Sequence, residues 1–269
     1  LYPGYLIKKV MWDAYTRVTS STGNTYPEVT RIIKQQQAAG ALIMDYAGHA
    51  SETQVSHENV LKITDFKEFR NTNLPLWVTA CCDIMPFDGV TSNIGEEAVL
   101  NPNGGAVAFY GTTRTVYAME NKYINRAFMR RVLSYVDGKP ITLGEAHRLA
   151  QNDIMMGSVV QGEKDNSQNH LQYSLLGDPA LSLNLPQRKV VVDSINGVDC
   201  AQTDAVAKLK AGSVARIAGH IEGAEDYQGV VTATVRDSRN QITCKLKDTS
   251  DDGASEAFRF YDRQKTLFN

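Results

Sequence analysis

A histidine and a pair of adjacent cysteines are the side chains of this 269-residue sequence best suited to nucleophilic chemistry. His49 follows the apolar run 41–44 after a short polar stretch, and Cys81 and Cys82 end the apolar run 74–80. An imidazole that accepts the proton of a thiol leaves a thiolate, which attacks carbonyl carbons. The residue types alone are equally compatible with structural roles, because buried cysteines are common and a histidine after glycine is often a turn residue.

The segments around these residues have the pattern of a parallel α/β sheet. Thr25 and Glu28 have the spacing of a capping box, which predicts a helix over about 27–39. Three short apolar runs each end at a polar or glycine-rich tip: 41–44, 74–80 and 104–110. Such runs are typical of strands buried on both faces. Because ligands bind beyond the carboxyl ends of parallel strands, we expect His49 and the cysteine pair to face each other there.

Two further helices and a β-rich region follow. Apolar stripes over 123–136 and over 142–150 predict helices that cover the sheet, the second starting at a Thr142/Glu145 capping box. From residue 189 onward, valine-rich segments of period two alternate with Gly, Asn and Asp, which predicts an immunoglobulin-like β-sandwich. We therefore predict an α/β domain over 1–186 and a β-domain over 187–269, and leave open whether the sandwich is truncated.

Charge and composition exclude several classes of partner. Lys and Arg total 28 against 30 Asp and Glu, so no overall basic field attracts nucleic acid. The apolar runs are far shorter than the roughly 18 residues that a membrane helix needs. The His, Asp and Glu residues lack metal-ligand spacing, so we expect neither a metal nor another cofactor. No signal peptide is visible at Leu1, and we expect further residues to precede it.

The remaining histidines and cysteines have weaker functional signals. His57, in a Ser-His-Glu setting, is an alternative base, although the setting favours a helix start. His147 falls within a predicted helix, and His170 and His220 fall near loops. Asp178, between Gly and Pro, is expected to form a turn by accepting backbone N–H groups. A disulfide between Cys200 and Cys244 in an exported protein is left open.

Several of these stretches resemble segments of the gingipain-type cysteine peptidases, relatives of caspases and legumains. Residues 45–53 resemble the Tyr-x-Gly-His-Gly-x-Glu-Thr stretch that carries the catalytic histidine, and 74–82 resemble the strand leading to the nucleophile. Residues 175–181, Leu-Leu-Gly-Asp-Pro-Ala-Leu, resemble the close of the catalytic domain. The resemblance implies a caspase-like half-domain flanked by helices and followed by an immunoglobulin-like domain. It also implies His49 as the base.

The resemblance assigns the nucleophile by register. Aligning the family strand from residue 74 without a gap puts its cysteine on Cys82, 33 positions after His49, whereas Cys81 needs a one-residue slip. Because successive side chains of a strand point to opposite faces, only one of the pair can readily face His49. Cys82 is therefore the predicted nucleophile and Cys81 the alternative. The N–H groups of Ala50 and Cys82 are the implied oxyanion hole.

Within the family, residues 79–88 resemble the PorU-type C-terminal-signal peptidases of the type IX secretion system, and shorter segments agree: 57–58, 101–106, 112–117 and 142–146. This subgroup implies a sortase-like enzyme at the bacterial outer membrane, working with outer-membrane secretion subunits. It would remove the C-terminal signals of secreted proteins through a thioester. The resemblance further implies that it joins the cleaved proteins to a lipopolysaccharide. The alternatives are a secreted digestive gingipain and an inactive scaffold of an export complex.

The sequence departs from the family at two positions. The residue after the histidine is Ala50 instead of Gly, which would cost about 1 kcal/mol if that position needs a positive φ. Pro86 stands where the subgroup has a basic residue. The resemblance also implies that residues 1–186 are the second half of a catalytic domain, with the acid that orients His49 lying upstream of Leu1.

Overall fold

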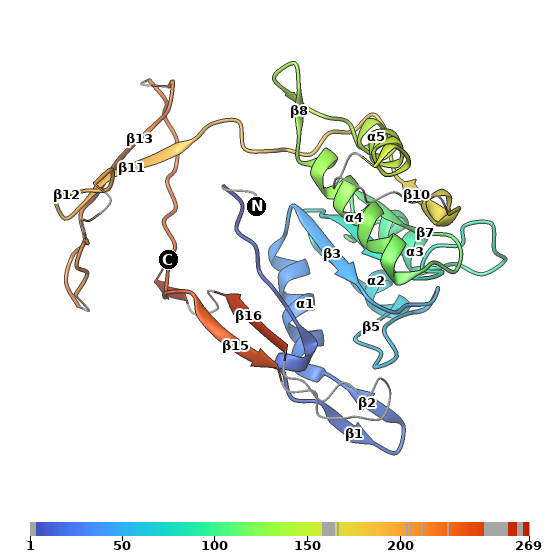
Figure 1. Cartoon of the computed structure of the whole chain (residues 1–269). Helices are drawn as coiled ribbons and strands as arrows, with labels where there is room; N and C mark the ends of the chain where they lie inside the picture. Colours follow the sequence, from blue (N-terminus) through green and yellow to red (C-terminus); the bar gives the residue numbers. More distant parts are fainter. Residues whose placement is uncertain are drawn as a thin grey trace. The chain divides into compact units, whose positions relative to one another are not determined.

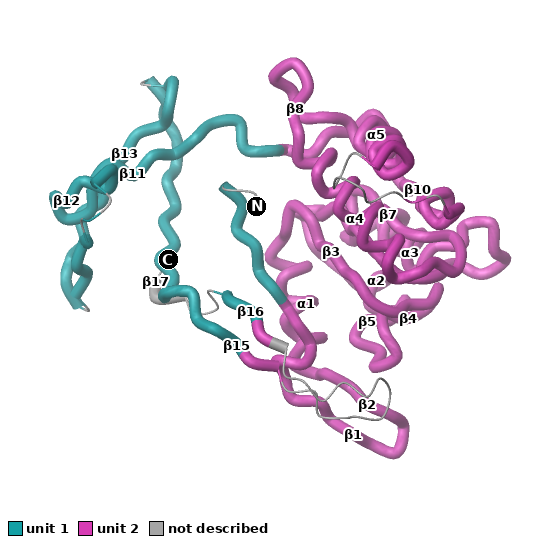
Figure 2. The backbone as a smooth tube through the Cα atoms, viewed as in Figure 1, with its two compact units in different colours: residues 1–9, 185–242, 260–269 teal, residues 10–184, 243–259 magenta. Residues whose placement is uncertain are grey.

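The computed structural model describes residues 4–157, 165, 167–202, 204, 206–210, 212–224, 226–244, 258–262 and 266–268. The chain forms two compact units, drawn in different colours in Figure 2. Residues 10–184 and 243–259 make up the first, here named the α/β unit. Residues 1–9, 185–242 and 260–269 make up the second, here named the β unit.

The centre of the α/β unit is a four-stranded sheet in the order β10-β7-β6-β3 (Figure 1). Its strands are β3 (Ile43–Ala47), β6 (Leu76–Ala80), β7 (Ala108–Thr112) and β10 (Tyr173–Leu176). The first three are parallel, as predicted, and β10 pairs antiparallel to β7. All residues of β6 and β7 are buried, which explains their continuous apolar sequences.

All three predicted strands begin later than their apolar runs suggest, β6 by two residues. β7 starts at Ala108 because the glycines before it make close approaches, Gly104 to Phe69 and Asn71 and Gly105 to the helix before it. Gly105 has φ +88°, and a Cβ there would lie only 2.1 Å from the carbonyl oxygen of Ala98. A position of this kind needs glycine. β3 is likewise shifted, and it continues to Ala47.

In the described part of the chain, the α-helices that accompany the sheet are α1 (Pro27–Ala39), α2 (Ile63–Glu68), α3 (Ile94–Leu100), α4 (Ala118–Val132) and α5 (Leu143–Met156). On one face, Phe66 of α2 packs edge-on against Trp77 of β6, with ring centroids 5.2 Å apart. On the other face, Phe128 of α4 stacks on Tyr110 of β7 at 3.8 Å. The sheet is therefore covered on both sides, and neighbouring residues of one strand enter different layers.

Of the two helix starts predicted from capping boxes, the structure contradicts the cap of α1 and supports that of α5. α1 covers 27–39 as predicted, but the capping box is wrong: the N-cap is Tyr26, and the Thr25 hydroxyl donates to the Val18 carbonyl instead. Pro27 sets the start, because its fixed φ suits the first helical turn. At α5 the Thr142 side chain accepts the N–H of Glu145 at 3.3 Å, which confirms Thr142 as N-cap, whereas the Glu145 carboxylate pairs with Arg148.

The apolar stripe over 123–136 does not match one helix. α4 ends at Val132, and Tyr135 and Val136 form a hairpin strand instead. The turn of this hairpin consists of Asp137 (φ 50°) and Gly138 (φ 75°). Two successive positive φ angles match the twist of a two-residue hairpin, so local turn chemistry overrides the helical periodicity.

Shorter elements complete the α/β unit: η1 (Trp12–Ala14), β1 (Val18–Ser20), β2 (Gly23–Thr25), β4 (Gln54–Val55), β5 (Leu61–Lys62), β8 (Tyr135–Val136), β9 (Lys139–Pro140) and η2 (Asn169–Gln172). The pairs β1–β2, β4–β5 and β8–β9 are antiparallel. Among the described residues, no helix is long and apolar enough to cross a membrane.

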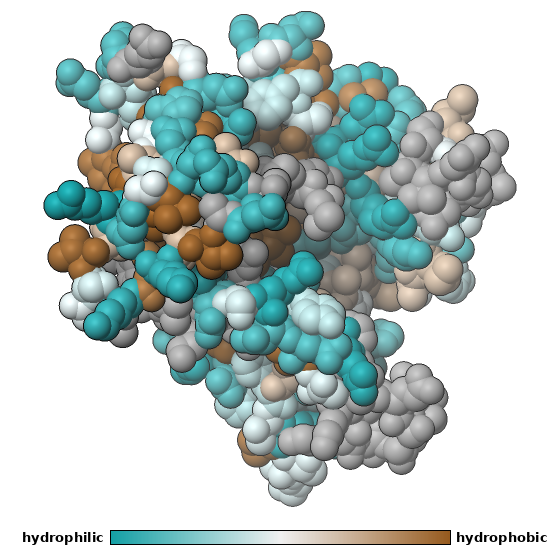
Figure 3. Space-filling view, turned by 60° about the vertical axis from the view of Figure 1, so that its left-hand side comes forward, coloured by the Kyte–Doolittle hydropathy of each residue, from teal (hydrophilic) through white to brown (hydrophobic). Residues whose placement is uncertain are grey.

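The β-rich remainder contains β11 (Val190–Ile195), β12 (Val198–Asp199), β13 (Ile217–Ile221), β14 (Val235–Arg236), β15 (Asn240–Cys244), β16 (Phe258–Asp262) and β17 (Thr266–Phe268). An antiparallel sheet has the order β12-β11-β13, and β14–β17 and β15–β16 form pairs. Val190 and Ile217 of this sheet are 63% and 47% exposed, and apolar surface is visible on the face drawn in Figure 3. An immunoglobulin-like sandwich over 187–269 stays a prediction.

Candidate active site

The strand register brings the loops that carry His49 and Cys82 together. Ala47, the last residue of β3, is level with Ala80, the last residue of β6. Because the strands are parallel neighbours, both loops leave the same edge of the sheet, about 5 Å apart. The N–H of Gly48 also donates to the Ala80 carbonyl at 3.2 Å, which extends the pairing past the strand ends. His49 directly follows Gly48 in the first loop, and Cys82 lies two residues after Ala80 in the second.

The two cysteines lie in opposite environments. Cys81 is fully buried in the layer that contains Phe66, Trp77 and Phe109. Burial raises the pKa of the Cys81 thiol to about 12, so it stays protonated at neutral pH. Cys82 is only partly buried, which leaves it as the thiol of the pair open to solvent. Cys81 continues the buried end of β6, whereas Cys82 lies where the chain bends away from the sheet.

Hydrogen bonds connect Cys82 and the loop that follows it to the loop after β7. The thiol of Cys82 donates to the carbonyl of Val116, with Sγ and O 3.3 Å apart. Asp83 has a left-handed backbone (φ 46°), and its N–H donates to the carbonyl of Arg114 at 3.2 Å. The hydroxyl of Thr115 donates to the Asp83 carboxylate at 2.8 Å. These bonds set the direction in which Cys82 leaves the sheet.

A two-pronged ion pair makes a second link between the same loops. Arg114 donates from both terminal nitrogens to the carboxylate of Asp88, with Nη1 and Oδ1 2.9 Å apart. The guanidinium lowers the pKa of Asp88, and the carboxylate raises that of Arg114. Both side chains are exposed, so the pair serves orientation more than stability. Pro86, between these contacts, accepts the N–H of Gly89 at 2.8 Å through its carbonyl.

His49 is exposed on a short hairpin. The N–H of Ser56 donates to the His49 carbonyl at 2.8 Å, and the N–H of Ser51 donates to the Gln54 carbonyl at 2.9 Å. The phenol of Tyr46 donates to the same His49 carbonyl at 2.7 Å. Two donors therefore hold the backbone of His49, one from the strand before it and one from the far arm of the hairpin.

Gly48 leaves room for the ring of Tyr46 next to the histidine. A Cβ at Gly48 would lie 2.4 Å from the hydroxyl oxygen of Tyr46 and 2.9 Å from the ring carbon that bears it. The ring of Tyr46 is itself stacked on Trp12, with centroids 5.6 Å apart. The Tyr-x-Gly-His pattern thus has a packing reason: glycine leaves room for the tyrosine to reach the histidine's own carbonyl.

His57 lies against His49. The two imidazole rings are nearly parallel, 8° apart in orientation, with centroids separated by 5.0 Å. The interpretation of Ser-His-Glu as a helix start is wrong, because residues 56–59 form a turn and α2 begins only at Ile63. Whether His57 is an alternative base stays a prediction.

The predicted oxyanion-hole donors have free backbone N–H groups. Ala50 is paired with Val55 in the antiparallel arrangement whose hydrogen bonds are made by the flanking residues, so its N–H points away from the hairpin. Among the described residues, neither this N–H nor that of Cys82 has an acceptor. Ala50 does not adopt a positive φ, so the strain expected if this position required glycine does not arise.

The other ionisable candidates lie apart from this pair of loops. His147 is on α5, where burial lowers its pKa and Tyr110 packs edge-on against its ring. His170, on η2, lies 3.5 Å from the Asp165 carboxylate. Asp178 confirms its predicted role, because Oδ1 accepts the N–H of Ala180 at 2.8 Å.

The β unit offers little chemistry in its described part. His220, on β13, pairs with Asp193 at 2.9 Å. Cys200 of the β unit is an exposed free thiol, whereas Cys244, which belongs to the α/β unit, is a buried free thiol. No group of three His, Cys, Asp or Glu side chains among the described residues could hold a metal ion.

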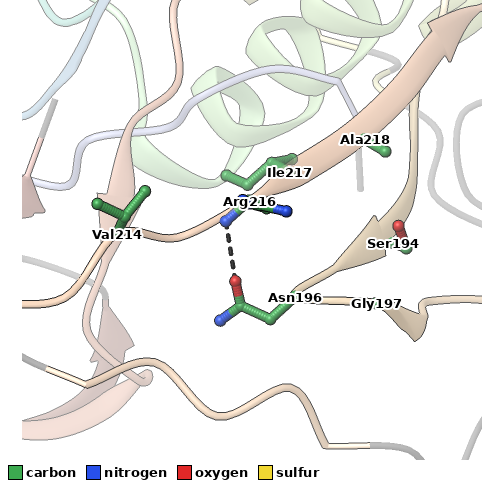
Figure 4. A pocket seen from close by; sticks show the side chains of 7 residues that line it. All are labelled: Ser194, Asn196, Gly197, Val214, Arg216, Ile217 and Ala218. Carbon is green, nitrogen blue, oxygen red and sulfur yellow. Dashed lines mark hydrogen bonds between the residues drawn. The ribbon is translucent and has the colours of Figure 1, made fainter.

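An open hollow of about 540 Å³ lies on the β unit and includes neither His49 nor Cys82. It is lined by Ser194, Asn196, Gly197, Val214, Arg216, Ile217 and Ala218 (Figure 4). The Asn196 side chain accepts the backbone N–H of Arg216 at 2.8 Å, so it is occupied in holding the turn. The lining residues include Ser194 but no His, Asp or Glu that could act as its general base, so this hollow is not our candidate active site.

Sequence reasoning missed three features of the site: the Tyr46 phenol, the stacking of His57, and the Val116 carbonyl that accepts the Cys82 thiol. Tyr46 could have been found from its place three residues before the histidine. The carbonyl of Val116 has no sequence signature, because every residue carries one.

Comparison with known proteins agrees with this geometry. The sequence profile described as peptidase family C25 matches residues 1–184. The chain belongs to peptidase family C25. No curated protein matches the sequence.

The α/β unit of this C25 member has the caspase-like fold of a gingipain. The complex of Porphyromonas gingivalis RgpB pro- and mature domains has a TM-score of 0.50 at 17% identity, covering 61% of this chain and 40% of that one. The Arg-specific cysteine proteinase gingipain R (RgpB) has a TM-score of 0.46 at 19% identity, covering 61% and 39%. The chain thus spans about 40% of the length of these relatives. At 17% identity, the likeness to the first shows the fold alone.

Proposed function

We propose that this C25 member is a cysteine endopeptidase in which Cys82 is the nucleophile and His49 the general base. The observation that carries the proposal is the register of β3 and β6, which sets the two loops side by side, joined by the Gly48–Ala80 hydrogen bond. The difference between the two thiols supports Cys82, because a buried, protonated Cys81 is a poor nucleophile.

In this mechanism, the imidazole of His49 takes the proton of the Cys82 thiol, and the thiolate attacks the carbonyl carbon of the scissile peptide bond. The tetrahedral intermediate collapses as the C–N bond breaks, and the imidazolium gives its proton to the departing amine. A thioester then joins the substrate's acyl group to Cys82. The free N–H groups of Ala50 and Cys82 are suited to stabilise the negative oxygen of the intermediate.

The thioester has two fates. Water gives hydrolysis, whereas an amine attacks the same carbonyl carbon, forms an amide and releases the Cys82 thiol. We propose the second fate, with secreted proteins that carry a C-terminal signal as substrates and a lipopolysaccharide amine as acceptor. The support is the PorU-type motif over residues 79–88 together with the segments 101–106 and 112–117. This assignment makes the protein an exported enzyme of the bacterial outer membrane, acting with secretion subunits there.

The proposal concerns the whole protein, because the chain spans only about 40% of its structural relatives. The acid that orients the imidazole and part of the substrate-binding wall are proposed to come from residues upstream of Leu1. Ala50 is the departure from the family that would favour an inactive scaffold, and its backbone, which has no positive φ, does not support that alternative.

The test is to incubate the complete protein with a small amine acceptor and a cargo that carries a C-terminal signal. The products are then identified by mass spectrometry. We expect a new amide at the cleaved carboxyl end, and no product with the Cys82→Ala variant. The Cys81→Ala variant is the matched control, and it should still form the amide. Hydrolysis alone would favour a digestive gingipain, and the absence of cleavage of any cargo would favour a scaffold.

A further inference from the structure

The stacked pair of His49 and His57 is not explained by the proposed chemistry, which uses only the first imidazole. The rings are 8° from parallel with centroids 5.0 Å apart, and both side chains are exposed. Exposed side chains rarely keep one orientation unless the backbone beneath them is fixed, because rotamer freedom favours disorder. The position of His57 is therefore informative only if its backbone is held.

The backbone of His57 is held by a tight turn. The Asn59 N–H donates to the Ser56 carbonyl at 3.2 Å, and the Val60 N–H donates to the Val55 carbonyl at 3.1 Å. Ser56, with φ 64°, reverses the chain immediately before His57. This reversal folds the residue after the hairpin back towards its first arm, where His49 lies.

The two ends of this turn are anchored in apolar layers. Val55 is buried in the layer shared with Phe66 and Trp77, and Val60 is buried against Tyr26 and Val29 of α1 and its cap. The Thr30 hydroxyl also donates to the Val60 carbonyl at 2.8 Å. His57 therefore projects from a rigid segment even though its own ring is exposed.

The backbone of His49 is held as well, by the Tyr46 phenol and the Ser56 N–H on its carbonyl. Only the side-chain torsions of His49 remain to be fixed. The face of the His57 ring restricts them, because a neighbouring flat ring favours the rotamer in which the two faces are parallel.

We propose that His57 is a positioning residue: by ring stacking it holds the imidazole of His49 in the orientation that serves Cys82. This inference rests on the proposed roles of His49 and Cys82. It assigns to a second histidine, in the turn after the hairpin, part of the orienting role that hydrogen-bonded acids have in other nucleophile–base pairs.

The geometry distinguishes a positioning role from proton transfer between the two histidines. Hydrogen bonds of imidazole nitrogens lie in the plane of the ring, whereas stacked rings present their faces to each other. A direct N–H···N bond between His49 and His57 is therefore incompatible with the stack. A flat ring without nitrogen atoms, such as phenylalanine, should then replace His57.

The test uses the 269-residue chain with Cys200→Ser, so that an exposed thiol elsewhere does not react. The variants are His57→Ala, His57→Phe and His49→Ala, with His220→Ala as a control that removes another exposed imidazole. The measurements are the rate of alkylation of Cys82 by iodoacetamide, located by peptide mapping, and the NMR shift of the carbon-bound ring proton of His49. Circular dichroism verifies that each variant is folded.

We expect His57→Ala to remove the upfield ring-current shift of His49 and to slow Cys82 alkylation by about two- to ten-fold, the range that aromatic pairing supports. His57→Phe should retain both the shift and the rate, and His220→Ala should change neither. Unchanged values in His57→Ala, or a loss in His57→Phe as large as in His57→Ala, would overturn the positioning role.

The NMR readout separates this inference from the proposed function. If His49→Ala leaves Cys82 alkylation unchanged, the roles proposed for His49 and Cys82 fail. The ring-current shift still decides whether His57 orients His49, since it does not depend on the thiol.

Discussion

The tips of β3 and β6 hold their reactive side chains by different means. Beyond β6, Cys82 directly follows Cys81, which is buried in the apolar layer, so packing of its neighbour fixes the thiol's place together with its hydrogen bond to the Val116 carbonyl. Beyond β3, His49 is exposed and is held by hydrogen bonds to its carbonyl and by a stacked ring. The first arrangement couples reactivity to the stability of the fold, and the second leaves the two nearly independent.

Substitution of each cysteine in turn tests this comparison with the largest expected effects. Cys82→Ala should abolish rapid alkylation at the tip of β6 and leave the free energy of unfolding almost unchanged. Cys81→Ala should leave the alkylation rate of Cys82 intact and lower the free energy of unfolding by about 1 kcal/mol, since it removes a small buried side chain.

Peptide mapping after brief alkylation, with urea denaturation of both variants, measures the two quantities. Fast labelling of Cys81 in the parent chain would show that the wrong thiol has been assigned to the core.

The second prediction concerns the loss of stability at alkaline pH that the buried thiol of Cys81 causes. Burial raises the pKa of Cys81 from about 9 to about 12, so the folded state keeps a proton that the unfolded state loses. Stability is therefore full below pH 9 and falls as the pH rises towards 12. Between pH 8 and pH 10.5 the parent chain should lose about 2 kcal/mol more than Cys81→Ala, at about 1.4 kcal/mol for each pH unit above 9.

Urea midpoints of the two chains across this pH range are the measurement. The buried tyrosines of the same sheet also destabilise the fold at high pH, but they are common to both chains and cancel. Parallel pH profiles would contradict the assigned burial.

The smallest effect is expected at the tip of β3. Gly48→Ala puts a methyl group 2.4 Å from the Tyr46 hydroxyl oxygen, so the ring must move and its hydrogen bond to His49 is lost. Because Gly48 has an ordinary φ, we expect a loss of only about 1 kcal/mol in unfolding free energy, together with slower Cys82 alkylation.

Tyr46→Phe is the matched variant, because it removes the same hydrogen bond without adding an atom. The two substitutions combined should cost less than the sum of their separate effects. Full additivity would mean that Gly48 and Tyr46 do not act through one contact.

Much of the sheet could be predicted because its signals are local. The helix over 27–39 depends on apolar spacing and on Pro27, and the strand ending at residue 80 depends on a continuous apolar run. Each signal lies within a short stretch of sequence. The late start of β7 could not be predicted, because it depends on the contact between Gly105 and the distant Ala98 carbonyl. β10 was not anticipated either, since its four residues are too few to establish a period.

The candidate site divides in the same way. The meeting of the His49 and Cys82 loops could be predicted from strand order alone, because parallel neighbours end at one edge. The place of His57 could not, because it depends on the positive φ of Ser56, a residue type that seldom adopts it. Turn conformations of this kind are set by tertiary contacts at Val55 and Val60.

The buried Cys81 has a further consequence, for how often the core opens. Its thiol can meet a reagent only when the strand end detaches from the layer beneath it, so its slow labelling at neutral pH counts these rare openings. Division of that rate by the rate of an unprotected thiol gives the fraction of molecules open at any moment. The chain therefore contains an internal probe of local unfolding one residue away from the thiol proposed to do the chemistry.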